Sequence, residues 1–149
     1  MYKVLTLWQP WATLFAHGIK KIETRPKPTS YEGTYLIHAA KQFNKYQKDI
    51  CKKEYFAEAL ESLGIKNDND LVRGAVVGAY DHIQCVELIT DEKFRRFLDY
   101  PERAFGDYTP GRYAWIGENH RVLQEPIPYK NGQGYYLNFK GDESKLIFK

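Results

Sequence analysis

Long apolar stretches and cysteines are both scarce in this chain of 149 residues. Its apolar runs fall far short of the roughly 20 residues that a membrane-spanning helix needs, so we expect no membrane insertion. The N-terminus leads directly into Trp8-Gln9-Pro10, without the apolar stretch and small-residue cleavage site of a signal peptide. Cys51 and Cys85 belong to no CxxC pair, which favours reduced, buried thiols in a cytoplasmic protein.

Recognisable metal-ligand and phosphate-loop motifs are also lacking. The four histidines, His17, His38, His82 and His120, show no ligand spacing with one another or with the cysteines, so we expect no metal site. No glycine loop of the Walker or dinucleotide type is found, and no Gly-x-Ser-x-Gly elbow. We therefore expect a protein without a cofactor.

Charge is nearly balanced over the whole chain but unevenly distributed along it. The formal net charge is only +3. Residues 1–56 hold 10 Lys and Arg against 4 Asp and Glu, whereas residues 57–108 hold 6 against 11. A basic first third beside an acidic middle is what one basic, polyanion-binding face would produce. Uneven solubilising charge explains the same pattern equally well.

The periodicity predicts a single domain over residues 1–149, without repeats or linkers. Helices are predicted from Pro10 to Gly18, over residues 43–63 with a stop at Gly64, and from Thr90 onward. Strands are predicted over residues 2–7, 21–25, 33–40, 75–88, 112–118, 122–123 and 134–139. The segment 75–88 is either one long strand or two strands joined by a bend. This strand-rich order favours an α+β fold in which helices pack outside a twisted or partly closed barrel, rather than a doubly wound sheet.

The densest group of charges runs from Gly18 to Arg25. If residues 21–25 form a strand, Lys21, Glu23 and Arg25 share one face and Thr24 faces the other way. A carboxylate between cations stays ionised and can hold a cationic head group in a fixed pose, which suits a phosphate or a base edge. A surface salt-bridge cluster of little energetic value has the same spacing.

Three segments together resemble the ASCH domain: residues 7–12 (LWQPWA), the motif G-x-K-x-x-E-x-R at residues 18–25, and residues 33–40 (GTYLIHAA). The resemblance continues in residues 74–78 and 113–116, in Pro126, and in residues 132–134. It implies a PUA-like β-barrel of about five to seven strands with flanking helices, a class that commonly binds RNA. It also implies ligand-facing roles for Lys20, Glu23 and Arg25.

Other candidate ligand-binding residues surround the motif. By the resemblance, Trp8 and Trp115 lie beside the cleft and His38 and Lys41 near its mouth, while Lys21 lies in the motif itself. A base stacked on an aromatic ring gains about 1–3 kcal/mol, although strand aromatics more often pack in a core. Lys41, Lys45, Lys48 and Lys52 form a stripe that is either a phosphate contact or a solvated helix face.

The leading hypothesis is a module that binds RNA or a modified nucleotide, with DNA as a possible ligand. The alternative is a small hydrolase of a nucleoside or RNA, resembling 4-acetylcytidine amidohydrolases or ribonucleases of this family, with Lys20 and Glu23 as the acid–base pair. Glu23 occupies the position of the amidohydrolase threonine, and Glu92 and Glu102 are candidates for its distal glutamate. A third hypothesis is a protein-interaction domain whose cleft binds no nucleotide.

Overall fold

The computed structural model describes residues 1–88, 102–131 and 137–149. Residues 134–136 of the strand predicted over residues 134–139 lie outside these ranges, as does most of the helix predicted from Thr90. The elements in chain order are β1 (Lys3–Leu7), α1 (Trp11–Ala16), β2 (Ile22–Arg25), β3 (Gly33–Ala39), α2 (Lys45–Cys51), α3 (Glu54–Ser62), η1 (Asp68–Asp70), β4 (Ala75–Glu87), α5 (Glu102–Phe105), β5 (Tyr113–Pro128) and η2 (Glu143–Lys145).

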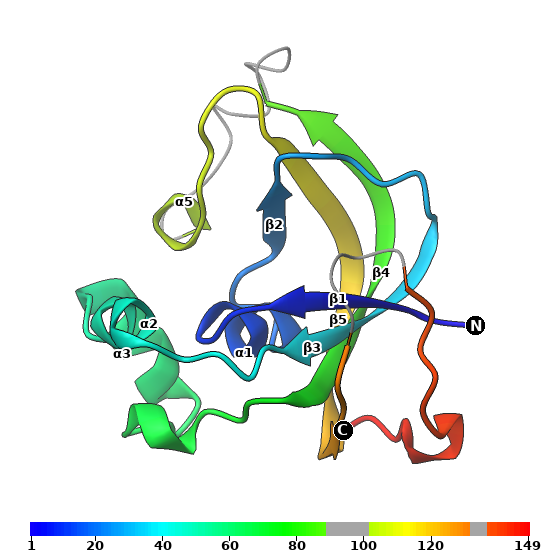
Figure 1. The fold of residues 1–149 in the computed structure, drawn as a ribbon. Helices are drawn as coiled ribbons and strands as arrows, with labels where there is room; N and C mark the ends of the chain where they lie inside the picture. Colours follow the sequence, from blue (N-terminus) through cyan, green and yellow to red (C-terminus); the bar gives the residue numbers. More distant parts are fainter. Residues whose placement is uncertain (89–101, 132–136) are drawn as a thin grey trace.

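The strands form one mixed sheet in the order β1-β3-β4-β5-β2 (Figure 1). β1 and β3 are parallel, whereas every other neighbouring pair is antiparallel. In the part of the chain that the structure describes, the sheet is open, because β1 and β2 lie at its two edges. The outer edge of β1 meets residues 137–139 through a bridge between Lys3 and Asn138. The α+β class is therefore established, and closure into a barrel stays a prediction.

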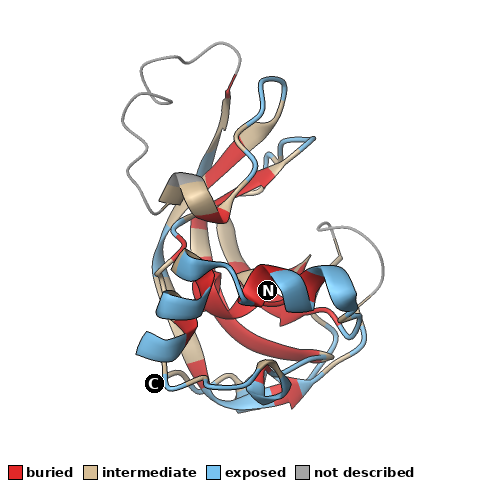
Figure 2. Cartoon of the chain, turned by 90° about the vertical axis from the view of Figure 1, so that its left-hand side faces the viewer, coloured by how far each residue is buried: buried red, intermediate tan, exposed pale blue. Residues whose placement is uncertain are grey.

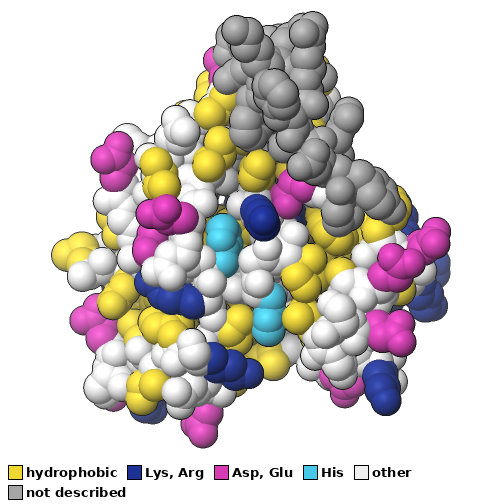
Figure 3. Space-filling model, turned by 180° about the vertical axis from the view of Figure 1, so that it is seen from behind, with side chains coloured by type: hydrophobic (Ala, Val, Ile, Leu, Met, Phe, Trp, Pro, Cys, Tyr) yellow, Lys and Arg dark blue, Asp and Glu magenta, His cyan; other side chains and the backbone are white. Residues whose placement is uncertain are grey.

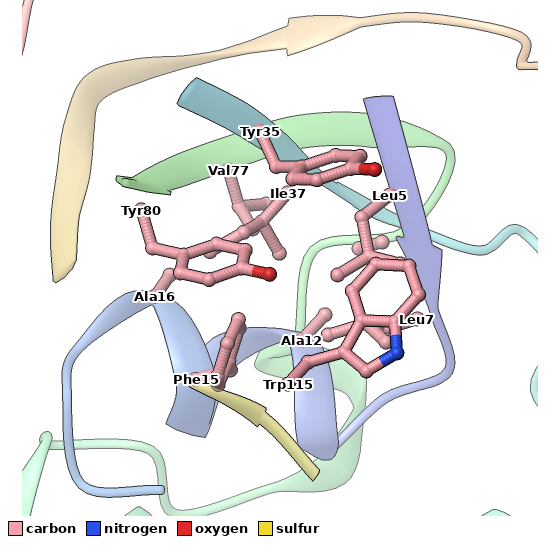
Figure 4. Packing of buried hydrophobic residues seen from close by; sticks show 11 residues of the cluster. Leu5, Leu7, Ala12, Phe15, Ala16, Tyr35, Ile37, Val77, Tyr80 and Trp115 are labelled. Atoms are coloured by element: carbon pink, nitrogen blue, oxygen red, sulfur yellow. The ribbon is translucent and has the colours of Figure 1, made fainter. Parts of the chain in front are cut away.

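Hydrophobic side chains are buried on both faces of the sheet. On one face, Leu5, Tyr35 and Ile37 pack against Phe15 and Ala16 of α1 (Figure 4). On the other, neighbouring strand residues such as Val4 and Leu36 are buried against the C-terminal segment, which contributes Phe139, Leu146 and Phe148. This alternation follows from the two-residue period of strands, and here both faces are buried.

β4 and β5 are long strands that curve around one side of the molecule, with α1 inside the curve (Figure 1). The register between them shifts at three places: between Val76 and Gly78, between Ala79 and Asp81, and between His82 and Gln84. Such bulges bend and twist the strand that carries them. Residues 112–118 and 122–123 were predicted as separate strands. They are parts of β5, which continues through Asn119 with a φ of 57°.

The single helix predicted over residues 43–63 is two helices. α2 begins at a capping box in which the side chains of Asn44 and Gln47 each accept a backbone N–H. It ends at Cys51 with Lys52 as its C-cap, and Lys53, which has an extended backbone, is the N-cap of α3. One straight helix could not direct Ile50 and Phe56 to the same side, because six residues correspond to a rotation of about 240°. The break brings both side chains into one cluster.

That third cluster joins α2 and α3 to Leu14 of α1 and Phe105 of α5. Exposed and buried residues alternate along α2 and α3, whereas α1 is buried along almost its whole length (Figure 2). Cys51 lies in this cluster, and burial raises the pKa of its thiol to about 11. Cys85 is half-buried instead of buried as predicted, and both cysteines are free. None of the described helices has the length and apolar character needed to cross a membrane.

Candidate functional site

The turn between β1 and α1 is held by a buried glutamine. Gln9 Nε2 donates to Thr13 Oγ1 at 2.7 Å and to the carbonyl oxygen of Val72 at 2.7 Å, while the Thr13 N–H donates to Gln9 Oε1 at 3.0 Å. These bonds satisfy the amide group and fix the start of α1. As a result, Trp8 and Trp11, on either side of the turn, both border the same cleft.

The end of α1 places Lys20. Gly18 has a φ of 72°, the left-handed conformation that commonly ends helices and favours glycine. The N–H groups of Ile19 and Lys20 then both donate to the carbonyl oxygen of Leu14, at 3.0 and 3.1 Å. The chain turns back under the helix, and the ammonium group of Lys20 lies 5.7 Å from the centre of the Phe15 ring. The prediction that Lys20 lies in the turn after this helix is confirmed.

Glu23 lies between two cations. Its Oε1 is 3.5 Å from Lys20 Nζ, and its Oε2 is 3.2 Å from Arg25 Nε. Lys20 is only 1% exposed, and its ammonium group also donates to the carbonyl oxygen of Ile22. Arg25 is half-buried and donates through Nη2 to the carbonyl oxygen of Thr6, which links β2 to β1. One carboxylate therefore holds a buried ammonium and a more accessible guanidinium at the end of the sheet.

These three residues line a cleft with a volume of about 610 Å³. The cleft lies between β2 and α5 on one side and α2 and α3 on the other (Figure 1). Among the described residues, four cationic side chains line it, namely Lys20, Arg25, Lys53 and Arg112, against two carboxylates, Glu23 and Asp107. The volume is within the range of about 300–1,000 Å³ typical of small-ligand sites. The excess of positive charge favours an anionic ligand.

Five of the described aromatic residues line the cleft: Trp8, Trp11, Tyr46, Phe56 and Phe105. Trp8 is 45% exposed. Trp11 is half-buried, its indole N–H donates to the carbonyl oxygen of Phe105 at 2.7 Å, and its ring stacks on Tyr46 with centroids 6.4 Å apart. Trp11 therefore packs against a buried cluster on one side and borders the cleft on the other. Flat, partly exposed rings beside cations can stack on a base.

Arg112 and Asp107 are cleft residues that sequence reasoning missed. Arg112 donates through Nη2 to the carbonyl oxygen of Thr24 at 2.8 Å, and its Nε lies 3.6 Å from Asp107 Oδ2. Thr109 donates its hydroxyl to Asp107 and holds the pKa of that carboxyl below its usual range. Thr24 borders the cleft too, although it was predicted to face away. The chain gives no local signal for Arg112, which lies 87 positions after Arg25 in the sequence.

Two other predicted residues near the motif lie outside the cleft lining. The side chain of Lys21 is exposed, and its backbone N–H donates to Glu102 Oε2 at 2.8 Å. Glu102 Oε1 accepts from the N–H of Ile22 at 3.0 Å and from the hydroxyl of Tyr108 at 3.0 Å. Glu102 therefore anchors the start of β2 and is not part of the cleft wall. Glu92 lies outside the described residues.

Trp115 is a core residue and not a wall of the cleft. Its side chain is 0% exposed, and its ring contacts those of Tyr35 and His82. Figure 4 shows it inside the buried cluster that α1 helps to form. Its indole N–H donates to the carbonyl oxygen of Lys27 at 3.0 Å. A base cannot stack on a ring that is covered on all sides. The placement of Trp115 beside the ligand is thus corrected: pairing puts it on the same face of the sheet as Glu23, but there it is covered by a buried cluster that includes Leu7 and Phe15.

His38 and Lys41 border a second hollow of about 990 Å³, which we call the groove. The groove adjoins the cleft, and both share Thr6, Trp8 and Arg25 in their linings. His38 Nε2 donates to the carbonyl oxygen of Tyr129 at 2.7 Å, which leaves Nδ1 to accept from the Thr6 hydroxyl at 3.1 Å. Burial lowers the pKa of His38, so this ring is neutral near pH 7 and positions its neighbours.

The cleft and groove together collect six of the eight residues proposed from the sequence: Trp8, Lys20, Glu23, Arg25, His38 and Lys41. Among the described residues, no three His, Cys, Asp or Glu side chains gather where they could hold a metal ion. The chemistry available at the cleft is that of fixed cations, two paired carboxylates and aromatic surfaces.

Comparisons with known proteins agree with the resemblance seen in the sequence. Activating signal cointegrator 1 from Homo sapiens is 25% identical over 126 residues, covering 85% of this chain and 20% of that protein. The Mus musculus protein of the same name is 24% identical, with the same coverage. The chain thus spans about a fifth of the length of these curated relatives.

One solved structure shows the same fold at low sequence identity. The crystal structure of ASCH from Zymomonas mobilis superposes with a TM-score of 0.54 and 16% identity, covering 97% of this chain and 92% of that one. A family model described as the ASCH domain matches residues 5–127. Because this match includes most of the chain, the protein belongs to the ASCH domain family.

Proposed function

We propose that this protein binds single-stranded RNA or a nucleotide, with one base and its phosphate in the cleft. The observation that carries the proposal is that an exposed tryptophan, Trp8, stands at the mouth of a cleft with more cationic than acidic side chains. Stacking and cationic contacts are the two interactions with which proteins hold single strands of any sequence. Membership of the ASCH domain family supports the same class of ligand.

Each cleft residue has a role in this proposal. Trp8 offers its ring to the base, and the guanidinium of Arg25 binds the phosphate. Lys20 is too buried to reach far into solvent, so it adds positive potential from the floor. Glu23, 3.2 Å from Arg25 Nε, holds the guanidinium in place. Arg112, held by Thr24, is a second phosphate contact.

Binding can be measured by fluorescence anisotropy with a labelled oligouridylate and by quenching of tryptophan fluorescence with uridine monophosphate. We expect Trp8→Ala and Arg25→Met each to weaken binding about tenfold or more, since loss of stacking alone costs about 1–3 kcal/mol. Lys66→Met is the matched control, because Lys66 is exposed and lines neither cavity.

Circular dichroism would verify that the variants keep their fold. Unchanged affinity in folded Trp8→Ala and Arg25→Met would contradict the proposal, and it would leave the protein-interaction hypothesis. Comparison with an oligodeoxyuridylate of the same length, which differs only in lacking the 2′-hydroxyls, decides between RNA and DNA. Tighter binding of the oligouridylate would show that a 2′-hydroxyl is recognised.

A second candidate function is hydrolysis of a nucleoside or RNA, with Lys20 and Glu23 as the acid–base pair. It is favoured by one observation, that these two side chains lie 3.5 Å apart at the wall of the cleft. Against it, both Glu23 oxygens face cations and Lys20 Nζ already donates to a backbone carbonyl. Such a carboxylate is better placed to orient Arg25 than to take a proton.

The two functions are separated by a turnover assay. Incubation with 4-acetylcytidine and with RNA, followed by mass spectrometry of the products, would detect hydrolysis. For a binding protein we expect no product above background at high protein concentration. Turnover that is lost in Glu23→Gln but retained in Lys66→Met would instead establish the hydrolase.

A further inference from the structure

The groove is built where the ends of three strands lie side by side. Ala39, the last residue of β3, pairs with Ala75, the first of β4, and Ala75 pairs with Pro128, the last of β5. The Gly74 N–H donates to the carbonyl oxygen of Ala39 at 2.8 Å, and the Tyr129 N–H donates to that of Gly74 at 3.0 Å. The chain segments that leave these strands are therefore held together by backbone hydrogen bonds.

Each of the three strand ends carries a cation two residues away. Lys41 follows β3, Arg73 precedes β4 and Lys130 follows β5, and all three are exposed and line the groove. The guanidinium of Arg73 lies over the Phe43 ring, 4.9 Å from its centre, which limits its movement. The fold thus gathers three cations that are distant in the sequence on one rim.

Their charges are not balanced by nearby acids. Within the described ranges, no Asp or Glu lines the groove, and no ion pair joins Lys41, Arg73 or Lys130 to a carboxylate. With Arg25 at the boundary to the cleft, four cations line this hollow. On the back of the molecule, by contrast, cationic and acidic side chains are interspersed over the visible described surface (Figure 3). A hollow lined by one sign of charge concentrates counter-ions of the other sign.

The floor of the groove is polar and rigid. The Thr6 hydroxyl donates to His38 Nδ1 and accepts from Asn131 Nδ2 at 2.9 Å. Asn131 Oδ1 is buried without a hydrogen-bond partner among the described residues. An unpaired buried acceptor costs stability unless a donor reaches it, and a ribose hydroxyl is such a donor.

We propose that the groove binds the backbone phosphates of the same RNA strand whose base occupies the cleft. This inference rests on the function proposed above. The strand passes over Trp8 and Arg25, the residues common to both hollows, and its next phosphates lie against Lys41, Arg73 and Lys130. With the groove, the affinity of the protein for RNA therefore depends on the length of the strand, whereas the cleft alone would hold a mononucleotide.

The test compares uridine monophosphate with oligouridylates of about two to eight nucleotides on the wild type and on Lys41→Gln/Arg73→Gln/Lys130→Gln. We expect affinity to rise with length in the wild type. In the groove variant, uridine monophosphate should bind as before, whereas the longest oligomer should lose about tenfold or more in affinity. The slope of log K against log[salt] should fall by about 2, since each lost contact removes roughly 0.7 on a single strand.

The matched control is Lys48→Gln/Lys52→Gln/Lys66→Gln, which removes three exposed cations that line neither hollow. It should bind every oligomer nearly as the wild type does. If this control lost as much affinity for the oligomers as the groove variant does, the strand would lie along α2 and the proposal would be overturned.

Two further outcomes would overturn it. One is an affinity for uridine monophosphate equal to that for the oligomers in the wild type, and the other is equal competition by polyglutamate, which would indicate an acidic peptide. Failure of the cleft would look different: oligomer binding would depend on the groove residues but survive Lys53→Gln/Arg112→Gln, which removes two cations that line the cleft and not the groove.

Discussion

At the scale of single residues, burial differs sharply among the three charged groups of the motif. Lys20 is almost completely buried, Glu23 is 9% exposed, and Arg25 is half-buried. Lys20 depends on Glu23 for its only carboxylate partner within the described residues, whereas Glu23 also has Arg25. Loss of the Glu23 carboxylate would therefore leave the buried ammonium of Lys20 without an opposite charge.

Glu23→Gln should lower the free energy of unfolding by about 3 kcal/mol, in the range measured when one partner of a buried ion pair is removed. Lys20→Met should lower the free energy of unfolding by less than Glu23→Gln does. Glu23 keeps Arg25 as its partner, and the methionine fills the space of the lysine stem. Urea unfolding of both variants measures the difference.

The double variant Lys20→Met/Glu23→Gln provides the matching control. It should lower the free energy of unfolding by less than the two single variants do in sum, since it removes both members of the pair. If Lys20→Met proved as costly as Glu23→Gln, the assignment of Glu23 as the central member of this cluster would be wrong.

At the scale of elements, the sequence predicted most strands but not the positions at which they bend. Strands near residues 3–7, 22–25, 33–39 and 75–87 are confirmed. The positions of the bulges in β4 and the break between α2 and α3 were not predicted, because both depend on which side chains must meet in the core. Gly78 lies at one of these bulges, where β4, β5 and α1 approach one another.

A methyl group on Gly78 would overlap the carbonyl oxygen of Arg121 and lie 2.8 Å from Cβ of Ala16. Gly78→Ala should therefore destabilise the protein by about 3 kcal/mol, as overpacking against backbone does. Gly64→Ala is the control: its added methyl meets no atom within 4 Å, and only the φ of 77° opposes it, at about 1 kcal/mol. Thermal unfolding would contradict this account if the two variants lost equal stability.

At the scale of the whole molecule, the distribution of charge is decided by the fold. The basic first third of the chain supplies Lys20, Arg25 and Lys53 to the cleft and Lys41 to the groove. The cations that complete the two hollows, Arg112, Arg73 and Lys130, come from later segments, and Arg73 belongs to the acidic middle of the chain. Counting charge along the sequence therefore indicates a basic face but not its extent.

The charged motif, its position after the first helix and the α+β class follow from the sequence alone. Local spacing determines them: Gly18 ends the helix, and the chain reverses direction within the next few residues. The tertiary structure decided that Trp115 is buried while Trp11 borders the cleft, because burial depends on what covers a side chain. It also decided that Lys41, Arg73 and Lys130 share one groove, since strand pairing brings together residues up to 89 positions apart.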